Sequence, residues 1–227
     1  MSKPLILFYQ KIGQPPQNSR FKKQWTSLRT LTRRLDNIKN RHINTLSPLQ
    51  LANAAPGKSV LLLFLGGYRS FYTEVYPLLK ARGLSACVCL PTACVGTYNS
   101  WQDPYQEPWQ DLLTWEEIRT LAQDPLISFG AMALQAQDIT LLPSKEAHFL
   151  AQESLFRLSK QLSKPPELFA LYPAVKSKWD ASSILPDFPG FIWSPKMCYQ
   201  GKNIVPTKNI PGNSWRAWIH LINGNKI

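Results

Sequence analysis

Residues 60–79 read VLLLFLGGYRSFYTEVYPLL, and this stretch decides the fold class. Its first six residues are apolar without a break, which is typical of a strand buried on both faces of a parallel sheet. Two glycines at 66–67 end the strand. Apolar residues then recur at the spacing of a helix, at Phe71, Val75, Leu78 and Leu79. A strand followed by a helix is the repeating unit of α/β folds.

The same alternation continues on both sides of this stretch. Apolar runs predict further strands at residues 5–9, 86–90, 127–133, 168–172 and 191–193. Helical spacing predicts an amphipathic helix with a basic outer face over 21–35, a helix after Thr114 with a capping box to Glu117, and a helix over 144–162. We therefore expect one α/β domain over residues 1–227, either a parallel barrel or a doubly wound sheet, with a site at the carboxyl ends of the strands.

The 227 residues carry a net charge of +12, and the basic residues gather at both chain ends. Residues 1–50 hold ten Lys and Arg against one Asp, a net charge of +9. Residues 51–156 hold six against ten, and residues 157–227 hold ten against three. Such an excess favours an anionic partner, such as a phospholipid surface or an acidic saccharide. Nucleic acid is disfavoured, because no nucleic-acid-binding motif occurs.

The sequence shows no targeting segment. The apolar run at 5–9 is too short for a signal peptide, and no stretch of about 18 uninterrupted apolar residues is present. The four cysteines lack a CxxC pair, and the alternation of Cys87 and Cys89 on a predicted strand indicates buried thiols rather than a metal site. We expect a cytoplasmic protein that could also lie peripherally on a membrane surface.

Five segments, in order along the chain, resemble the motifs of the NodB-type polysaccharide deacetylases, a carbohydrate esterase family. They are similar to the family's opening strand I-L-x-Y-H-x-I, its T-F-D-D-G stretch, the helix before its histidine strand, its G-x-H-T-x-x-H-P-D-L-T motif and its closing L-P-R-I-x-x-P-G. The segments are 6–12 (ILFYQKI), 60–79, 114–119 (TWEEIR), 129–140 (FGAMALQAQDIT) and 205–212 (VPTKNIPG). The resemblance spans nearly the whole chain and implies a distorted (β/α)7 barrel of the TIM-like type.

The resemblance also implies which residues should carry catalysis. The family holds a divalent metal, usually zinc, with one Asp and two His, and uses a second Asp as the base that deprotonates the metal-bound water. Here Leu65 stands at the base position, Gly66 at the metal-binding Asp, Met132 and Ala136 at the two His, and Gln10 at the opening-strand His. Leu, Gly and Ala offer no lone pair, and a Met thioether suits soft ions rather than zinc. We expect no metal, no cofactor and no catalytic residue at these positions.

The mouth of such a barrel could still bind a sugar, because aromatic rings stack on sugar faces and amides bond to hydroxyl groups. The candidates at strand ends and in the loops that follow are Tyr9, Gln10, Tyr68, Trp101, Gln135, Asp138, Tyr172 and Lys208. The three tyrosines are equally well explained as core aromatics with a hydrogen-bonded hydroxyl. The loop aromatics Trp101, Tyr105 and Trp109 are typical of a lid or a contact surface.

Three functional hypotheses follow. The first is a pseudoenzyme, a catalytically inactive deacetylase homologue that binds a saccharide, a glycolipid or a protein of unknown identity in surface-polysaccharide metabolism. The second is a metal-independent or residual deacetylase or hydrolase that uses Asp138, Tyr172 or Lys208. The third is a basic scaffold for a membrane surface or nucleic acid. The loss of every metal-binding donor favours the first, although its pathway rests on family analogy alone.

Overall fold

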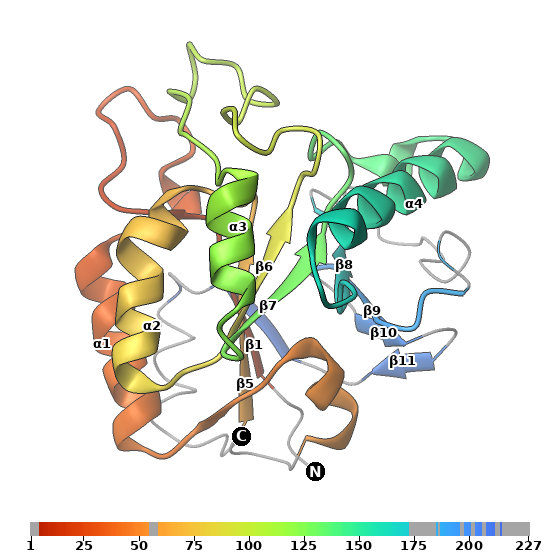
Figure 1. Cartoon of the computed structure of the whole chain (residues 1–227). Helices are drawn as coiled ribbons and strands as arrows, with labels where there is room; N and C mark the ends of the chain where they lie inside the picture. Colours follow the sequence, from red (N-terminus) through yellow and green to blue (C-terminus); the bar gives the residue numbers. More distant parts are fainter. Residues whose placement is uncertain are drawn as a thin grey trace.

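The computed structural model describes residues 5–54, 59–172, 185, 187–195, 198–200, 203–205, 208–211 and 214 (Figure 1). Its strands are β1 (Leu5–Tyr9), β2 (Lys11–Ile12), β3 (Trp25–Thr26), β4 (Asn44–Thr45), β5 (Ser59–Leu65), β6 (Ala86–Leu90), β7 (Ile127–Ala131), β8 (Leu168–Ala170), β9 (Phe191–Trp193), β10 (Cys198–Gln200), β11 (Asn203–Val205) and β12 (Lys208–Pro211). The main sheet has the order β11-β10-β9-β8-β7-β6-β5-β1-β12, with β4 at the side of β5. Strands β2 and β3 form a separate parallel pair.

The main sheet is a curled parallel barrel. Strands β1, β5, β6, β7, β8 and β9 follow one another in parallel, and β12 returns parallel to β1. The antiparallel strands β10 and β11 extend the sheet beyond β9. This arrangement confirms the expected α/β barrel.

Strand β5 explains why residues 60–65 are apolar without alternation. All seven residues of β5 are buried. Leu61, Leu63 and Leu65 pack inside the barrel with the two strand cysteines, whereas Val60 and Leu62 pack on the outside against the helices. Because both faces of the strand are covered, both sets of side chains must be apolar. Cys87 and Cys89 are free thiols on the inner face, as the sequence predicted.

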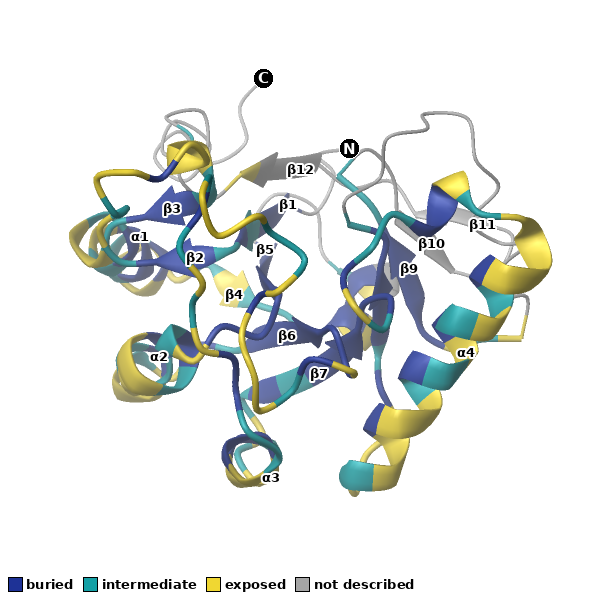
Figure 2. Cartoon of the chain, turned by 90° about the horizontal axis from the view of Figure 1, so that it is seen from above, coloured by how far each residue is buried: buried dark blue, intermediate teal, exposed yellow. Residues whose placement is uncertain are grey.

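The helices cover the outer face of the sheet. They are α1 (Leu28–Asn40), α2 (Tyr76–Arg82), α3 (Trp115–Ala122) and α4 (Ser144–Gln161), with short turns η1 (Lys22–Gln24), η2 (Pro48–Asn53), η4 (Ile139–Leu141) and a π-helical turn η3 (Phe71–Val75). Each α-helix turns its buried side to the strands and its exposed side outward (Figure 2). The predicted capping box is present at α3, where Thr114 and Glu117 exchange backbone and side-chain hydrogen bonds.

The predicted helix over residues 21–35 was wrong at its start. Helix α1 begins at Leu28, because the Ser27 hydroxyl accepts a hydrogen bond from the Thr30 amide and caps the helix there. Trp25 instead lies in strand β3, which pairs with β2. The predicted basic outer face also includes one buried residue, since Arg34 is only 4% exposed.

Two predicted strands end earlier than expected. Strand β7 ends at Ala131 and β8 at Ala170, so Met132 and Tyr172 lie in the loops just beyond the strands. The loops at this end of the barrel, including residues 91–113, stand above the sheet in Figure 1.

Within the described part of the chain, no helix is both long enough and apolar enough to cross a membrane.

Candidate functional site

A pocket of about 210 Å³ opens at the carboxyl ends of the parallel strands. Its walls come from residues just after β1, β5, β7 and β8 and from two loops that lie above them. We call it the barrel-mouth pocket. Its lining residues are Gln10, Gln24, Leu65, Gly66, Tyr68, Trp101, Gln102, Met132, Ala136 and Tyr172.

Amide and phenol groups supply the polar side of the barrel-mouth pocket. The Tyr172 hydroxyl donates a hydrogen bond to Gln10 Oε1 at 3.3 Å, and Gln102 Nε2 donates to Gln24 Oε1 at 2.9 Å. Burial raises the pKa of Tyr172, and burial raises the pKa of Tyr68 with smaller contributions from Glu107 and Tyr172. Both phenols therefore stay protonated at neutral pH and can donate hydrogen bonds.

The other side of the barrel-mouth pocket is apolar. Leu65 and Met132 are 1% and 2% exposed and belong, with Ala136, to the cluster that fills the barrel interior. Trp101 packs its ring 6.2 Å from that of Tyr68. The positions that resemble the family's base and its two histidines thus form an apolar floor beside an aromatic wall.

The backbone at two of these positions is also unusual. Gly66 has φ +95°, and a Cβ atom added there would lie 2.7 Å from Cε2 of Tyr68. Ala136 adopts φ +56°, in the left-handed region that residues with a Cβ rarely occupy. An aspartate side chain at position 66 would therefore require Tyr68 and the local backbone to move.

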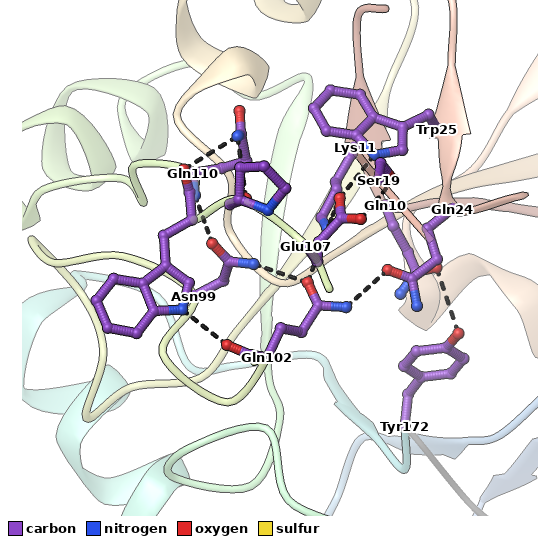
Figure 3. Close-up of polar contacts among 12 residues, drawn as sticks. Gln10, Lys11, Ser19, Gln24, Trp25, Asn99, Gln102, Glu107, Gln110 and Tyr172 are labelled. Carbon is purple, nitrogen blue, oxygen red and sulfur yellow. Dashed lines mark hydrogen bonds and ion pairs between the residues drawn. The ribbon is translucent and has the colours of Figure 1, made fainter. Parts of the chain in front are cut away.

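A buried ion pair holds the loop above the pocket in place (Figure 3). Lys11 Nζ lies 2.6 Å from Glu107 Oε1 and 2.7 Å from Gln102 Oε1. Glu107 also accepts hydrogen bonds from the Ser19 hydroxyl at 2.5 Å and from the Trp25 indole at 2.8 Å. The ion-pair residues are 1% and 0% exposed. Glu107 thereby joins β2, β3 and the loop after β2 to the loop over residues 91–113.

The surroundings shift the pKa values of both partners in this ion pair. Burial lowers the pKa of Lys11, and its bond to Glu107 opposes that effect. Burial alone would raise the pKa of Glu107, but hydrogen bonds from Lys11, Ser19 and Trp25 together hold the pKa below its ordinary value. Glu107 is therefore ionised at neutral pH and is held by three hydrogen bonds, from Lys11, Ser19 and Trp25.

The structure brings Gln10, Tyr68, Trp101 and Tyr172 together at the barrel-mouth pocket, but not the other predicted ligand-binding residues. Tyr9 points to the outer face of the sheet, where its ring stacks on that of Phe64. Gln135 is exposed and does not line the pocket.

Asp138 does not line the pocket either. Asp138 caps the short helix η4, accepting bonds from the amide and hydroxyl of Thr140 at 3.0 and 2.5 Å. Lys208 lies in β12, where its backbone pairs with that of Leu5 in β1. The side chain of Lys208 lies outside the described part of the structure. A catalytic role for Asp138 gains no support from this placement.

Sequence reasoning missed Gln24, Gln102, Lys11 and Glu107. Gln24 and Gln102 lie 78 positions apart and meet only because two loops fold over the same strand ends. Glu107 is a single carboxylate in a loop rich in proline and aromatic residues, and no sequence pattern marks it as buried. Their roles follow from long-range loop packing alone.

The residues present do not fit a zinc ion. Among the described residues, the lining of the barrel-mouth pocket offers amide, phenol, indole and thioether groups but neither imidazole nor carboxylate. In the described ranges, no group of three or more His, Cys, Asp and Glu lies close enough together to hold a metal ion. The thioether of Met132 is a soft donor and a poor replacement for a histidine.

Comparisons with known proteins agree with this architecture. The sequence profile described as polysaccharide deacetylase matches residues 52–182, which is more than half of the chain. No curated protein gives a significant sequence match.

Three similar solved structures define the fold. The structure of IcaB from Ammonifex degensii has a TM-score of 0.75 at 17% identity and covers 100% of this chain and 98% of that chain. A de-N-acetylase from Aggregatibacter actinomycetemcomitans has a TM-score of 0.71 at 16% identity over 93% and 96% of the two chains. The Streptococcus pyogenes deacetylase PplD, in complex with acetate, has a TM-score of 0.63 at 20% identity over 77% and 76%. At these identities the likeness shows the barrel fold and nothing finer.

Proposed function

The chain belongs to the polysaccharide deacetylase family, and from that premise we propose that it is a catalytically inactive member that binds a saccharide at the barrel mouth. One observation carries the proposal: the described lining of the barrel-mouth pocket combines amide and aromatic side chains, which suit a sugar, and includes no His, Asp or Glu that could hold zinc. The proposed role is that of a carbohydrate-binding component rather than a hydrolase.

The polar lining supports a saccharide as the ligand. The amides of Gln10 and Gln24 each have a donor and an acceptor that suit sugar hydroxyls, whereas Gln102 Oε1 already accepts from Lys11 and Asn99. Trp101 and Tyr68 supply aromatic surface for the apolar face of a ring. Leu65 and Met132 form an apolar floor that suits the methyl group of an acetamide.

The size of the pocket also limits the ligand. A volume of about 210 Å³ is below the roughly 300–1,000 Å³ of pockets that enclose drug-sized molecules. We therefore expect one acetylated sugar unit to enter the barrel mouth, while the rest of a chain stays outside.

The loss of catalysis follows from the same residues. Hydrolysis of an acetamide needs a polarised carbonyl and an activated water. Leu65, Met132 and Ala136 can neither hold a zinc ion nor accept a proton, and the carboxylate of Glu107, which is buried beside the pocket, is engaged by Lys11, Ser19 and Trp25. A bound acetamide would therefore remain intact.

The test combines a binding measurement with an activity assay. An N-acetylglucosamine tetramer should bind the purified protein in isothermal titration calorimetry, and Trp101→Ala should weaken binding by at least about tenfold. Tyr105→Ala is the matched control, because Tyr105 belongs to the same loop, is 91% exposed and does not line the pocket. Stoichiometric zinc in the purified protein together with metal-dependent acetate release would show that the proposal is wrong.

A further inference from the structure

One basic residue of helix α1 occupies a core position. The buried side of the helix consists of Leu31, Arg34, Leu35 and Ile38. Arg34 is 4% exposed, although the residues beside it on this side of the helix belong to the apolar core. Burial lowers the pKa of Arg34, but a guanidinium keeps its proton at neutral pH. A full positive charge therefore lies inside the protein.

No carboxylate among the described residues neutralises this charge. None of the ion pairs that these residues form includes Arg34. Arg34 Nη2 donates a hydrogen bond of 2.9 Å to the backbone oxygen of Ser214, which is a neutral acceptor. Ser214 belongs to a segment, residues 188–227, that contains neither Asp nor Glu. A buried charge without a counter-charge is costly, so its presence requires an explanation.

The other donors of Arg34 have no acceptor within the described residues. Its Nε and Nη1 atoms are buried and unpartnered, and so is the hydroxyl of Tyr9. Tyr9 lies on β1 in the same core cluster as the apolar residues of α1, and Arg34 and Tyr9 each affect the pKa of the other. Buried donors are almost always paired in folded proteins. A cation and a phenol that both have unpaired donors in one layer indicate an acceptor that does not come from these residues.

Tyr9 does not supply the missing negative charge itself. Burial raises the pKa of Tyr9 to about 12, with Arg34 opposing that shift. The phenol is therefore neutral at pH 7 and is available as a donor. A water molecule would accept from these donors but would leave the charge of Arg34 unbalanced, whereas an anion satisfies both.

The surroundings favour a small monovalent anion. Arg34 contributes a single positive charge, so a divalent ion such as sulfate would bring an unbalanced negative charge into the core. The apolar residues of α1 beside it offer no hydrogen bond to replace lost water. An anion that loses its hydration at little cost, such as chloride, is therefore favoured over strongly hydrated fluoride.

We propose that Arg34 and Tyr9 form a buried site for a halide-sized monovalent anion, chloride, between α1 and β1. The anion accepts hydrogen bonds from the guanidinium and the phenol, while Arg34 Nη2 holds the backbone at Ser214. Ser214 follows β12, the strand that pairs with β1, so the bound anion stabilises the closure of the barrel. The site is independent of saccharide binding at the barrel mouth.

Thermal unfolding at constant ionic strength tests the site. When sodium chloride replaces sodium gluconate stepwise, the Tm of the unmodified protein should rise by about 3–5 °C for each tenfold increase in chloride above its Kd. Replacement by sodium fluoride should raise the Tm much less, because fluoride loses more hydration on burial.

Three variants assign the effect to these residues. Arg34→Met keeps an apolar stem and should abolish the chloride dependence. Tyr9→Phe removes only the hydroxyl and should weaken chloride affinity by about threefold to tenfold. Arg29→Met is the matched control, because it removes the same charge from an exposed position of α1 and should leave the chloride dependence unchanged.

Crystals grown in bromide give a readout that does not depend on stability. An anomalous difference peak between Arg34 and Tyr9 is expected in the unmodified protein and should be missing in Arg34→Met. If Arg34→Met does not fold, Tyr9→Phe and the bromide peak of the unmodified protein decide the question. The same chloride dependence in Arg34→Met or an unchanged chloride affinity in Tyr9→Phe would overturn the proposal, as would bromide peaks at the protein surface alone, which would mean an adventitious ion only.

Discussion

Gly66, which by sequence resemblance corresponds to the family's metal-binding aspartate, adopts a backbone φ of +95°. Only glycine occupies this region without strain. The Tyr68 ring approaches so closely that any Cβ at position 66 would overlap it. The change at this position therefore involves the backbone and its neighbours as well as the side chain, and replacing single residues would not rebuild a zinc site.

Gly66→Ala should lower the free energy of unfolding by more than about 2 kcal/mol, because strain at positive φ adds to the contact with Tyr68. Gly83→Ala is the matched control: its φ is +65°, and nothing lies within 4 Å of an added Cβ. That variant should lose only about 1 kcal/mol. Urea unfolding of both variants checks the difference, and equal losses would contradict the role assigned to Tyr68.

At the scale of elements, the loop over residues 91–113 depends on one buried carboxylate. Glu107 bonds to β2, to β3 and to Ser19 in the loop between them. The same loop places Trp101 and Gln102 in the barrel-mouth pocket. The geometry of that pocket therefore depends on the Lys11–Glu107 pair.

Glu107→Gln should destabilise the fold by about 3 kcal/mol at neutral pH, because it leaves the Lys11 charge buried without a counter-charge. Adding Lys11→Met should recover part of the loss, since the unpaired charge is then gone. Urea unfolding of the single and double variants measures both effects. A double variant less stable than the single one would contradict this account of the ion pair.

The same ion pair gives stability a defined pH dependence. Because the folded-state pKa of Glu107 is lowered, its contribution is fully present above the unfolded-state pKa of about 4.3 and is lost as the pH falls through the lower folded-state pKa. The unmodified protein should therefore lose stability below about pH 4. Glu107→Gln should show less of that loss when unfolding is measured across the same pH range.

At the scale of the whole molecule, the first fifty residues carry the largest excess of positive charge. Their net charge is +9, with ten Lys and Arg against one Asp. Seven of these basic residues are exposed, on η1, on α1 and on the segments beside them: Arg20, Lys22, Lys23, Arg29, Arg33, Lys39 and Arg41. Helix α1 turns its exposed side away from the barrel (Figure 2).

We expect this surface to bind anionic vesicles of phosphatidylglycerol at low salt and to release them as salt screens the charges. Arg29→Glu combined with Arg33→Glu should weaken vesicle sedimentation more than Lys145→Glu combined with Lys164→Glu, which changes the net charge equally at exposed sites elsewhere. Equal effects would mean that net charge alone, rather than the α1 surface, governs binding.

The sequence by itself predicted the barrel and the apolar residues at its mouth. Unbroken apolar runs such as 60–65 identify strands covered on both faces, and motif spacing places Leu65, Gly66, Met132 and Ala136 at the strand ends. Both are local patterns, and local patterns are what a sequence displays directly. Helix α1 was mispredicted at its start because the apolar period continues through residues that pair with β2 instead.

Only the tertiary structure decided what surrounds those positions. Gln24 and Gln102 reach the barrel mouth from different loops, and Glu107 meets Lys11 across 96 positions of sequence. The same folding directs Tyr9 to the outer face. These relations depend on how loops pack on a completed barrel, and no spacing within one segment encodes them.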